Sequence, residues 1–324
     1  MKDRVLIVTS SYDRTCDYLI SKYKDVKFFR FNMDRFSAYK ISVTSTGFSI
    51  SDPFTELTSH NCKSIYFRKP THENLGEVYD AKYHQFSYRE SYSLIEGLVE
   101  YFPGKCLSKP SIMRRAGNKV FQALVAKEIG LRIPTLSITN SVTSVKKISE
   151  DETIVKPLSV GSIVIGKRKE YVQTNLYDEK FDLSLLKYTP AYFQRFVEKD
   201  YEVRVTFIDS KAYCVRIDSE DTVDWRKPGN TVAYRKWEIP EAIYTKCLLY
   251  LKTVDMCFGC FDFIVRDEQW YFLEMNSNGQ WAWLELETGL PISKGIMSYL
   301  NDWPNNRKDI SIAKLFSAFS FFYR

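Results

Sequence analysis

The sequence of 324 residues is 44% hydrophobic and 27% charged, which is typical of a globular protein with room for two or three domains. No apolar run reaches about 18 residues and no signal peptide is present, so we expect a cytoplasmic protein without a membrane-spanning helix. The net charge of +6 permits an acidic partner, but the absence of a basic stripe argues against nucleic acid.

The seven cysteines are scattered, which is typical of reduced thiols rather than of a disulfide framework. Cys257 and Cys260 form a CxxC pair, but there is no second such pair, and the chain has only three histidines. We therefore interpret them as small buried residues that lead into a strand, and not as a metal or redox site.

The first 110 residues alternate predicted strands with predicted helices. Apolar runs predict strands at 4–9, 26–32 and 63–70, and a helical stripe predicts a helix over 86–102. This pattern favours an N-terminal open α/β domain over 1–110. The segment contains no GxGxxG, so dinucleotide binding is not supported.

Two further domains are predicted, at 111–190 and 191–324. The second begins with a helix over 117–129 that stops at Gly130, followed by a small antiparallel lobe. The third combines antiparallel strands with several helices. Its predicted segments are strands within 191–219, a helix over 239–254, a hairpin over 261–281, a helix over 291–300 and a C-terminal helix in the tail.

The hairpin carries three oxygen-bearing side chains, Asp262, Glu274 and Asn276. Glu274 and Asn276 share a face because side chains alternate along a strand, and Asp262 joins them if it pairs opposite Glu274. That register requires a three-residue loop, Asp267–Gln269, since a two-residue loop would turn Asp262 to the opposite face. Three hard oxygens match Mg²⁺. The alternative is that the carboxylates pair with nearby Arg or Lys.

Three cations stand where they could hold phosphates beside such a metal: Lys119 in the first turn of its helix, Lys156 at the end of a strand, and Arg216 within a strand. A lysine flanked by apolar strand residues needs an anionic partner, which favours a ligand role for Lys156. The loop around Gly161 lacks the P-loop pattern and is a weak phosphate signal.

Taken together, these features resemble the ATP-grasp enzymes over about residues 105–305. The hairpin pattern Asp-x₁₁-Glu-x-Asn is the most specific of the motifs. In chain order the motifs are NKVFQALVAKEIGLRIPT, IVKPLSVG, QRFVEKDYEVRV and GCFDFIVRDEQWYFLEMNSNGQW. The resemblance implies an N-terminal open α/β domain, a small central antiparallel lobe and a C-terminal antiparallel sheet lobe, with ATP between the two lobes.

By position, the resemblance also implies residue roles. Lys119 and Lys156 would contact phosphates and adenine, and Glu202 would take the ribose hydroxyls. Arg216 would hold the γ-phosphate or an acyl phosphate and act in catalysis with Lys156. The adenine-facing hinge would be Gln194, Arg195, Phe196 and Val197, and the Mg²⁺ ligands would be Asp262, Glu274 and Asn276. Arg195 stands where a Glu is common in the family, which matters little if backbone atoms read the base.

Within the superfamily the chain is similar to the ribosomal peptide maturases of microviridin and graspetide type. The marks are YFRKP at 66–70, VDWRKPG at 223–229 and NSNGQWAWLELETGLPI. This resemblance implies ATP-dependent macrocyclisation of a precursor peptide with leader and core, through acyl phosphates of Asp or Glu that Thr, Ser or Lys side chains attack. The product is an ester or an amide, and a homodimer is compatible with the sequence.

Four residues are candidates for binding acidic groups of that peptide: Arg68, Lys69, Asp224 and Arg226. The alternative is solvated surface charge. A ligase that adds an amino acid such as glutamate is an alternative enzyme, and a nucleotide-binding module without chemistry is an alternative of another class. The complete Asp262, Glu274 and Asn276 set speaks against the second. Trp281 and Trp283 are interpreted as core residues.

Overall fold

The computed structural model describes residues 3–159, 162–165, 168–171, 174–221 and 230–301. Its first unit is a parallel sheet in the order β2-β1-β6-β7, as the alternating sequence pattern predicts. The strands are β1 (Arg4–Thr9), β2 (Lys27–Asn32), β6 (Cys62–Phe67) and β7 (Lys105–Leu107). Four successive β1 side chains, Val5 to Val8, are fully buried, because helices cover both faces of the sheet.

The helices α1 (Arg14–Lys22) and α2 (Ala81–Tyr101) cover opposite faces of this sheet. A short 3₁₀ helix, η1 (Met33–Ala38), leads to a small antiparallel sheet, β3-β4-β5, which the sequence pattern did not predict. Its strands, β3 (Lys40–Thr44), β4 (Gly47–Ser51) and β5 (Glu56–Thr58), bury only Ile50 and Leu57, so they lack a clear apolar signal.

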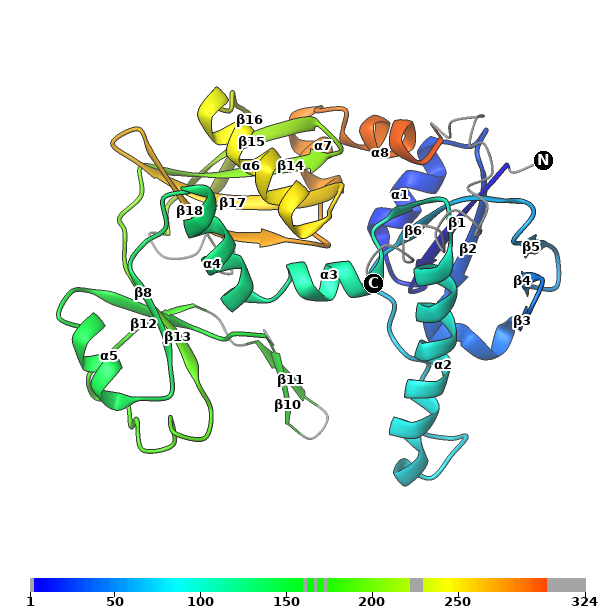
Figure 1. Ribbon diagram of the computed structural model, residues 1–324, viewed down its shortest axis with the longest axis horizontal. Helices are drawn as coiled ribbons and strands as arrows, with labels where there is room; N and C mark the ends of the chain where they lie inside the picture. Colours follow the sequence, from blue (N-terminus) through cyan, green and yellow to red (C-terminus); the bar gives the residue numbers. More distant parts are fainter. Residues whose placement is uncertain (1–2, 160–161, 166–167, 172–173, 222–229, 302–324) are drawn as a thin grey trace, which may run out of the picture.

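The central lobe is an antiparallel sheet in the order β12-β9-β13-β8, with a separate hairpin of β10 and β11 (Figure 1). Its elements are β8 (Leu136–Thr139), α5 (Val142–Ile148), β9 (Thr153–Lys156), β10 (Ser162–Ile165), β11 (Arg168–Tyr171), β12 (Asn175–Leu176) and β13 (Ala191–Arg195). Two helices, α3 (Pro110–Ala116) and α4 (Lys119–Ile129), connect it to the first unit. Asn118 caps the start of α4. Gly130, at φ 80°, ends this helix, as predicted.

The C-terminal lobe is a five-stranded antiparallel sheet in the order β16-β15-β14-β17-β18. One face packs on α4 and α6, and the other packs on α7, α8 and α1 of the first unit. The elements are β14 (Tyr201–Ile208), β15 (Lys211–Ser219), β16 (Val232–Lys236), α6 (Glu241–Val254), β17 (Phe258–Arg266), β18 (Gln269–Asn276), α7 (Ala282–Thr288) and α8 (Ile292–Asn301). No helix in the described ranges is long and apolar enough to cross a membrane.

Several sequence interpretations can be placed on this architecture. Trp281 is fully buried, and Trp283 packs at the rim of the same core. Cys260 is a free, buried thiol within β17, and Cys257 precedes that strand. The predicted C-terminal helix lies outside the described residues. The domain limits at residues 110 and 190 remain predictions.

The first unit and the C-terminal lobe are joined by a buried arginine. Arg68 follows β6, is 0% exposed, and forms an ion pair with Asp13 at 3.1 Å. Its guanidinium also donates to the Gly279 carbonyl at 3.3 Å and to Gln280 Oε1 at 2.8 Å, just beyond β18. A buried charge is tolerated only when paired and hydrogen-bonded, so these contacts hold the two units together.

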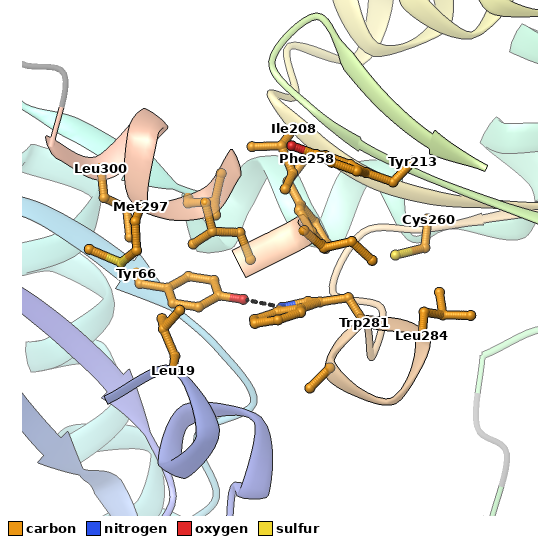
Figure 2. Packing of buried hydrophobic residues seen from close by; sticks show 14 of the residues in the cluster. Leu19, Tyr66, Ile208, Tyr213, Phe258, Cys260, Trp281, Leu284, Met297 and Leu300 are labelled. Atoms are coloured by element: carbon orange, nitrogen blue, oxygen red, sulfur yellow. Dashed lines mark hydrogen bonds between the residues drawn. The ribbon is translucent and has the colours of Figure 1, made fainter. Parts of the chain in front are cut away.

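The same junction contains a hydrogen bond between two large aromatic side chains. Trp281 donates its indole N–H to the Tyr66 hydroxyl at 3.0 Å, as Figure 2 shows. The Tyr66 hydroxyl also accepts from Arg68 at 3.2 Å. Polar atoms and apolar rings are therefore buried together between β6 and the start of α7.

We expect Arg68→Met to lower the free energy of unfolding by about 3–5 kcal/mol, because Asp13 would remain buried without its counter-charge. Burial alone would raise the pKa of Asp13, but Arg68 and hydrogen bonds hold it below its usual value. In the parent protein, the stability that this pair contributes is therefore lost as the pH falls through the lowered pKa. Urea unfolding across acidic pH measures both effects.

In Arg68→Met the unpaired Asp13 should gain a raised pKa, so acidification should partly restore stability. The double variant Asp13→Asn/Arg68→Met serves as the control, because it has no charge to titrate. Equal acid sensitivity in the parent and in Arg68→Met would show that the pair does not carry this stability.

Candidate active site

The turn between β17 and β18 has two residues and not the three that the sequence analysis required. Arg266 pairs with Gln269 across the hairpin, and Asp267 and Glu268 form the loop. Both loop residues have positive φ, 48° and 60°, which is the type I′ geometry that matches the twist of the flanking strands. The predicted three-residue loop is therefore wrong.

The metal-site register is nevertheless present, because a β-bulge replaces the longer loop. Phe263 pairs with Phe272, but the next pair is Asp262 with Glu274, so Leu273 is the extra residue. An extra residue moves every later side chain of β18 to the other face. Asp262 and Glu274 thus lie directly opposite each other on one face, as the chemistry demanded.

Asp262 is 7% exposed and is held by an arginine that the sequence analysis did not single out. Arg204 of β14 pairs opposite it and donates from Nε at 2.7 Å and from Nη2 at 2.8 Å. Burial alone would lower the pKa of Arg204, but the charge of Asp262 raises it above its usual range. The sequence does contain an indication of this role, because Glu202, Arg204 and Thr206 alternate with apolar residues and so share one face of the strand.

Two lysines from other elements face Glu274. Lys119 Nζ lies 3.7 Å from Glu274 Oε2 and donates to the Pro157 carbonyl at 2.9 Å. Lys156, at the end of β9, is 9% exposed and sits 4.3 Å above the centre of the Tyr192 ring. Burial lowers the pKa of Lys156 to about 8, against the raising effect of Glu274 and with a further lowering by Lys119. The structure thus brings both predicted lysines toward the hairpin.

A glutamine fixes the backbone between the two β18 ligands. Gln122 of α4 is 4% exposed, accepts from the Met275 N–H at 3.0 Å and donates to the Met275 carbonyl at 2.7 Å. The same amide also donates to the Ala116 carbonyl at 2.8 Å. Because β18 is an edge strand, these bonds satisfy backbone groups that no neighbouring strand reaches. Gln122 therefore positions Glu274 and Asn276 through the chain between them.

The predicted adenine-facing residues lie at the end of β13. The Arg195 N–H donates to the Thr135 carbonyl at 2.8 Å, and the Phe196 N–H donates to the Glu152 carbonyl at 2.7 Å. The side chain of Gln194 is buried, and its Oε1 has no hydrogen-bond partner in the described part of the chain. The N–H groups of Arg195 and Phe196 already donate to backbone carbonyls. An adenine base would therefore contact other groups of the segment from Gln194 to Val197.

Two other predicted nucleotide contacts are placed differently. Glu202 is nearly buried and forms an ion pair with Lys199. Arg216 pairs opposite Val203, which faces α6, so its side chain is on the face of the sheet opposite to Asp262. There it stacks 3.8 Å from the centre of the Tyr201 ring. The structure does not bring Arg216 to the hairpin, whereas Arg204 lies there.

The predicted peptide-binding residues require corrections. Arg68 is fully buried and occupied by the junction described above, so it is neither surface charge nor free to bind an acidic peptide. It was misjudged because sequence alone does not show which arginine has a buried partner. Lys69 is exposed at the end of β6. Asp224 and Arg226 lie outside the described residues.

This chain is similar to a known protein family and to several solved structures. Residues 4–113 match the family model of the MvdD pre-ATP grasp domain. A RiPP-associated ATP-grasp ligase from Chryseobacterium gregarium, in complex with ADP and a leader and core peptide, superimposes with a TM-score of 0.84 at 27% identity, over 93% of this chain and 97% of that one. The chain is an ATP-grasp ligase.

Other solved structures share the same fold. The ATP-grasp ligase resembles macrocyclase MdnC from Microcystis aeruginosa, bound with precursor peptide MdnA, with a TM-score of 0.82 at 26% identity, over 92% of this chain and 99% of that chain. Macrocyclase MdnB from the same organism gives a TM-score of 0.77 at 23% identity, over the same shares of the two chains. No relative among the curated proteins matches the sequence. The predicted ATP-grasp fold is confirmed.

We expect Lys156 to titrate near pH 8 in the ligand-free enzyme, well below an ordinary lysine, because burial disfavours its charge. The chemical shift of its ¹³Cε, followed by NMR against pH, measures this value. Glu274→Gln should lower the pKa further, because it removes the charge that raises it. Lys119→Met should raise it, because it removes a nearby positive charge.

The variant Lys156→Arg assigns the resonance by deleting it. A Lys156 pKa at the ordinary lysine value, or one that does not respond to Glu274→Gln, would contradict the buried arrangement of these three side chains.

Proposed function

We propose that this ATP-grasp ligase uses ATP and Mg²⁺ in the cytoplasm to macrocyclise a ribosomal precursor peptide. It activates Asp or Glu side chains of the core as acyl phosphates and joins them to Thr or Ser hydroxyls or to Lys amines. The observation that carries the proposal is the convergence of Asp262, Glu274 and Asn276 on one hairpin with Lys119 and Lys156 facing them.

The solved relatives support the substrate class. The Chryseobacterium ligase is in complex with ADP and a leader and core peptide, and MdnC is bound with its precursor peptide. The ATP-grasp ligase PsnB, complexed with a minimal precursor, Mg and ADP, shares the fold at 17% identity. We infer from these likenesses that the substrate of this chain is a peptide and that its nucleotide is bound with magnesium.

The donor set fits Mg²⁺. Arg204 donates once to each oxygen of Asp262, but a carboxylate has about four lone-pair sites, so both oxygens keep capacity for a metal. Glu274 adds a carboxylate, and Asn276 an amide oxygen, from the neighbouring strand. Two or three protein oxygens with remaining sites for water and phosphate are the arrangement that Mg²⁺ prefers. When bound, the ion would neutralise phosphate charge.

The chain's own residues account for the remaining demands of phosphoryl transfer. A carboxylate resists attack until it is phosphorylated, and the charge of the transferring group must be balanced in a site that excludes water. We assign that balance to Lys119 and Lys156, which approach from α4 and β9 on the side facing Glu274. Arg204 holds Asp262 in a fixed rotamer. The hydroxyl or amine then displaces phosphate, and phosphate leaves as an ester or amide forms.

Mass spectrometry of a candidate precursor incubated with ATP and Mg²⁺ tests the reaction. Macrocyclisation should remove one water for each bond formed, with no added mass, and ATP should be converted to ADP in equal number. A mass gain of one amino acid residue would instead establish the amino-acid-adding ligase. ATP turnover with no change in any peptide would contradict both.

We expect Asn276→Ala and Asp262→Asn each to lower kcat/KM by at least about a hundredfold, because a metal is worth several kcal/mol and each 1.36 kcal/mol is tenfold in rate. Asp267→Asn in the exposed turn is the matched control and should retain activity, because Asn tolerates positive φ. Asn276→Ala leaves the Asp262–Arg204 pair intact but removes the acceptor of the Asn278 N–H at 3.2 Å, so an unchanged melting temperature must accompany the lost activity. Full activity of both variants would refute the metal assignment.

A further inference from the structure

A cavity lies between the first unit and the C-terminal lobe, beside the connecting helix α3. The first unit and α3 contribute residues 104–106, 108–109 and 112 to its lining, and the C-terminal lobe contributes residues 251–252, 255–257 and 299. The volume of this β7–α6 cavity is about 570 Å³, which is within the range of cavities that hold small molecules. Its size is therefore that of a small-molecule site.

The β7–α6 cavity is separate from the hairpin that carries the metal ligands. Cys257, which lines the cavity, precedes Asp262 by five residues, and a strand advances about 3.4 Å per residue, so the two lie about 17 Å apart. The lining includes neither Lys156 nor Arg204. A molecule bound in the cavity would therefore leave the active site open.

The lining of the cavity is mainly basic. Lys105, Lys109 and Lys252 line it, against one carboxylate, that of Asp255. Lys109 donates to the Glu100 carbonyl at 2.6 Å, and neither Lys109 nor Lys252 forms an ion pair within the described ranges. Cavities lined by charge of one sign concentrate ions of the opposite sign. The charge of the lining therefore favours an anionic ligand.

A buried hydroxyl at the cavity lacks a strong hydrogen-bond partner. Ser108 follows β7 and is 5% exposed. In the part of the chain that the structure describes, its Oγ has no partner beyond a weak approach to the Cys257 thiol. Buried polar groups are normally hydrogen-bonded, and an anionic oxygen in the cavity would accept from this hydroxyl. Ser108 thus indicates a ligand of the same charge as the lysines do.

Apolar side chains line another part of the cavity. Leu251 is 3% exposed and Met256 is 7% exposed, and both belong to the core between α6 and the sheet. Ile112 of α3 joins them in the lining. A ligand that matches the whole lining therefore combines an anionic group with an apolar body.

We propose that the β7–α6 cavity binds a small organic phosphate, with the phosphate at the lysines and Ser108 and its apolar body against Leu251 and Met256. A phosphate monoester carries nearly two negative charges at pH 7, which matches three lysines against one aspartate, whereas a carboxylate carries only one. Because both units line the cavity, the bound molecule would hold them together. The inference does not depend on the proposed function.

Isothermal titration calorimetry with phenyl phosphate tests the site. The full chain is first saturated with a non-hydrolysable ATP analogue and Mg²⁺, so that the active site is filled. One phenyl phosphate should bind per chain, and Lys109→Met/Lys252→Met should weaken binding by at least about tenfold, because two charged contacts are lost. Lys127→Met, at an exposed position of α4 outside the cavity, is the matched control and should bind like the parent. No binding to the parent, or equal binding by the double variant, would overturn the proposal.

Two single variants separate ligand binding from folding. Ser108→Ala should weaken phenyl phosphate binding severalfold without lowering the melting temperature of the ligand-free protein, because the hydroxyl has no strong partner there. Asp255→Asn should strengthen binding, since it removes the negative charge of the lining, and Asn tolerates the φ of 60° at this position. Unchanged affinity in both variants would contradict the assigned contacts.

Benzoate and inorganic phosphate test the two halves of the ligand separately. Benzoate keeps the ring but carries one charge, and inorganic phosphate keeps the charge but has no apolar body, so both should bind more weakly than phenyl phosphate. Benzoate binding as tightly as phenyl phosphate would overturn the assignment to phosphate. Inorganic phosphate binding as tightly would show that the apolar lining takes no part.

Discussion

The buried guanidinium of Arg68 is the constraint on which the arrangement of this ATP-grasp ligase depends. Its five N–H groups cannot be left without acceptors in the interior, and those acceptors come from two units far apart in the sequence. Asp13 and Tyr66 belong to the first unit, whereas Gly279 and Gln280 follow β18. Separating the units would strand a charge, so the relative position of the two is set by electrostatics as well as by apolar packing.

A second set of polar contacts joins the C-terminal lobe to α1 of the first unit. Glu285 of α7 accepts from Tyr18 at 2.9 Å and pairs with Lys22, both on α1, and it also accepts from the Ser293 N–H at 2.6 Å. Burial alone would raise the pKa of Glu285, but Lys22 and these hydrogen bonds lower it. The segment that follows the Asp262 hairpin is therefore bound to the first unit at two places, through Arg68 and through Glu285. Lys156 belongs to the sheet of the central lobe. The site is therefore formed between the C-terminal lobe, which is bound to the first unit, and the central lobe.

Much of this could be predicted from the sequence, for identifiable reasons. Buried strands such as β1 have unbroken apolar runs, and α4 ends at Gly130 because only a residue that tolerates positive φ fits there. The alternation of side chains placed Glu274 and Asn276 on one face, and the pairing of Asp262 opposite Glu274, which the metal chemistry required, is present in the structure. The bulge at Leu273 could not be predicted, because an extra residue in a strand leaves no mark in an apolar run.

Charged residues were the hardest to place from the sequence. Arg68, Arg204 and Arg216 all lie in or beside strands, and composition does not distinguish them. Arg204 is buried because Asp262, on the distant strand β17, lies opposite it, and this pairing follows from the sheet order β14-β17-β18 and not from any local stretch. Arg216 lies opposite Val203 of the preceding strand, β14, on the face that packs on α6, and which face of the sheet meets α6 is decided only in the folded chain.

The bulge also has a consequence for how this hairpin can change over evolutionary time. The pairing of Asp262 with Glu274 depends on the number of residues between them, since the turn and the extra residue Leu273 together set the facing of every later side chain. Substitutions in the turn keep that count, whereas a single insertion or deletion would turn Glu274 and Asn276 away from Asp262. The segment can therefore vary in composition but not in length, unless a second change restores the count.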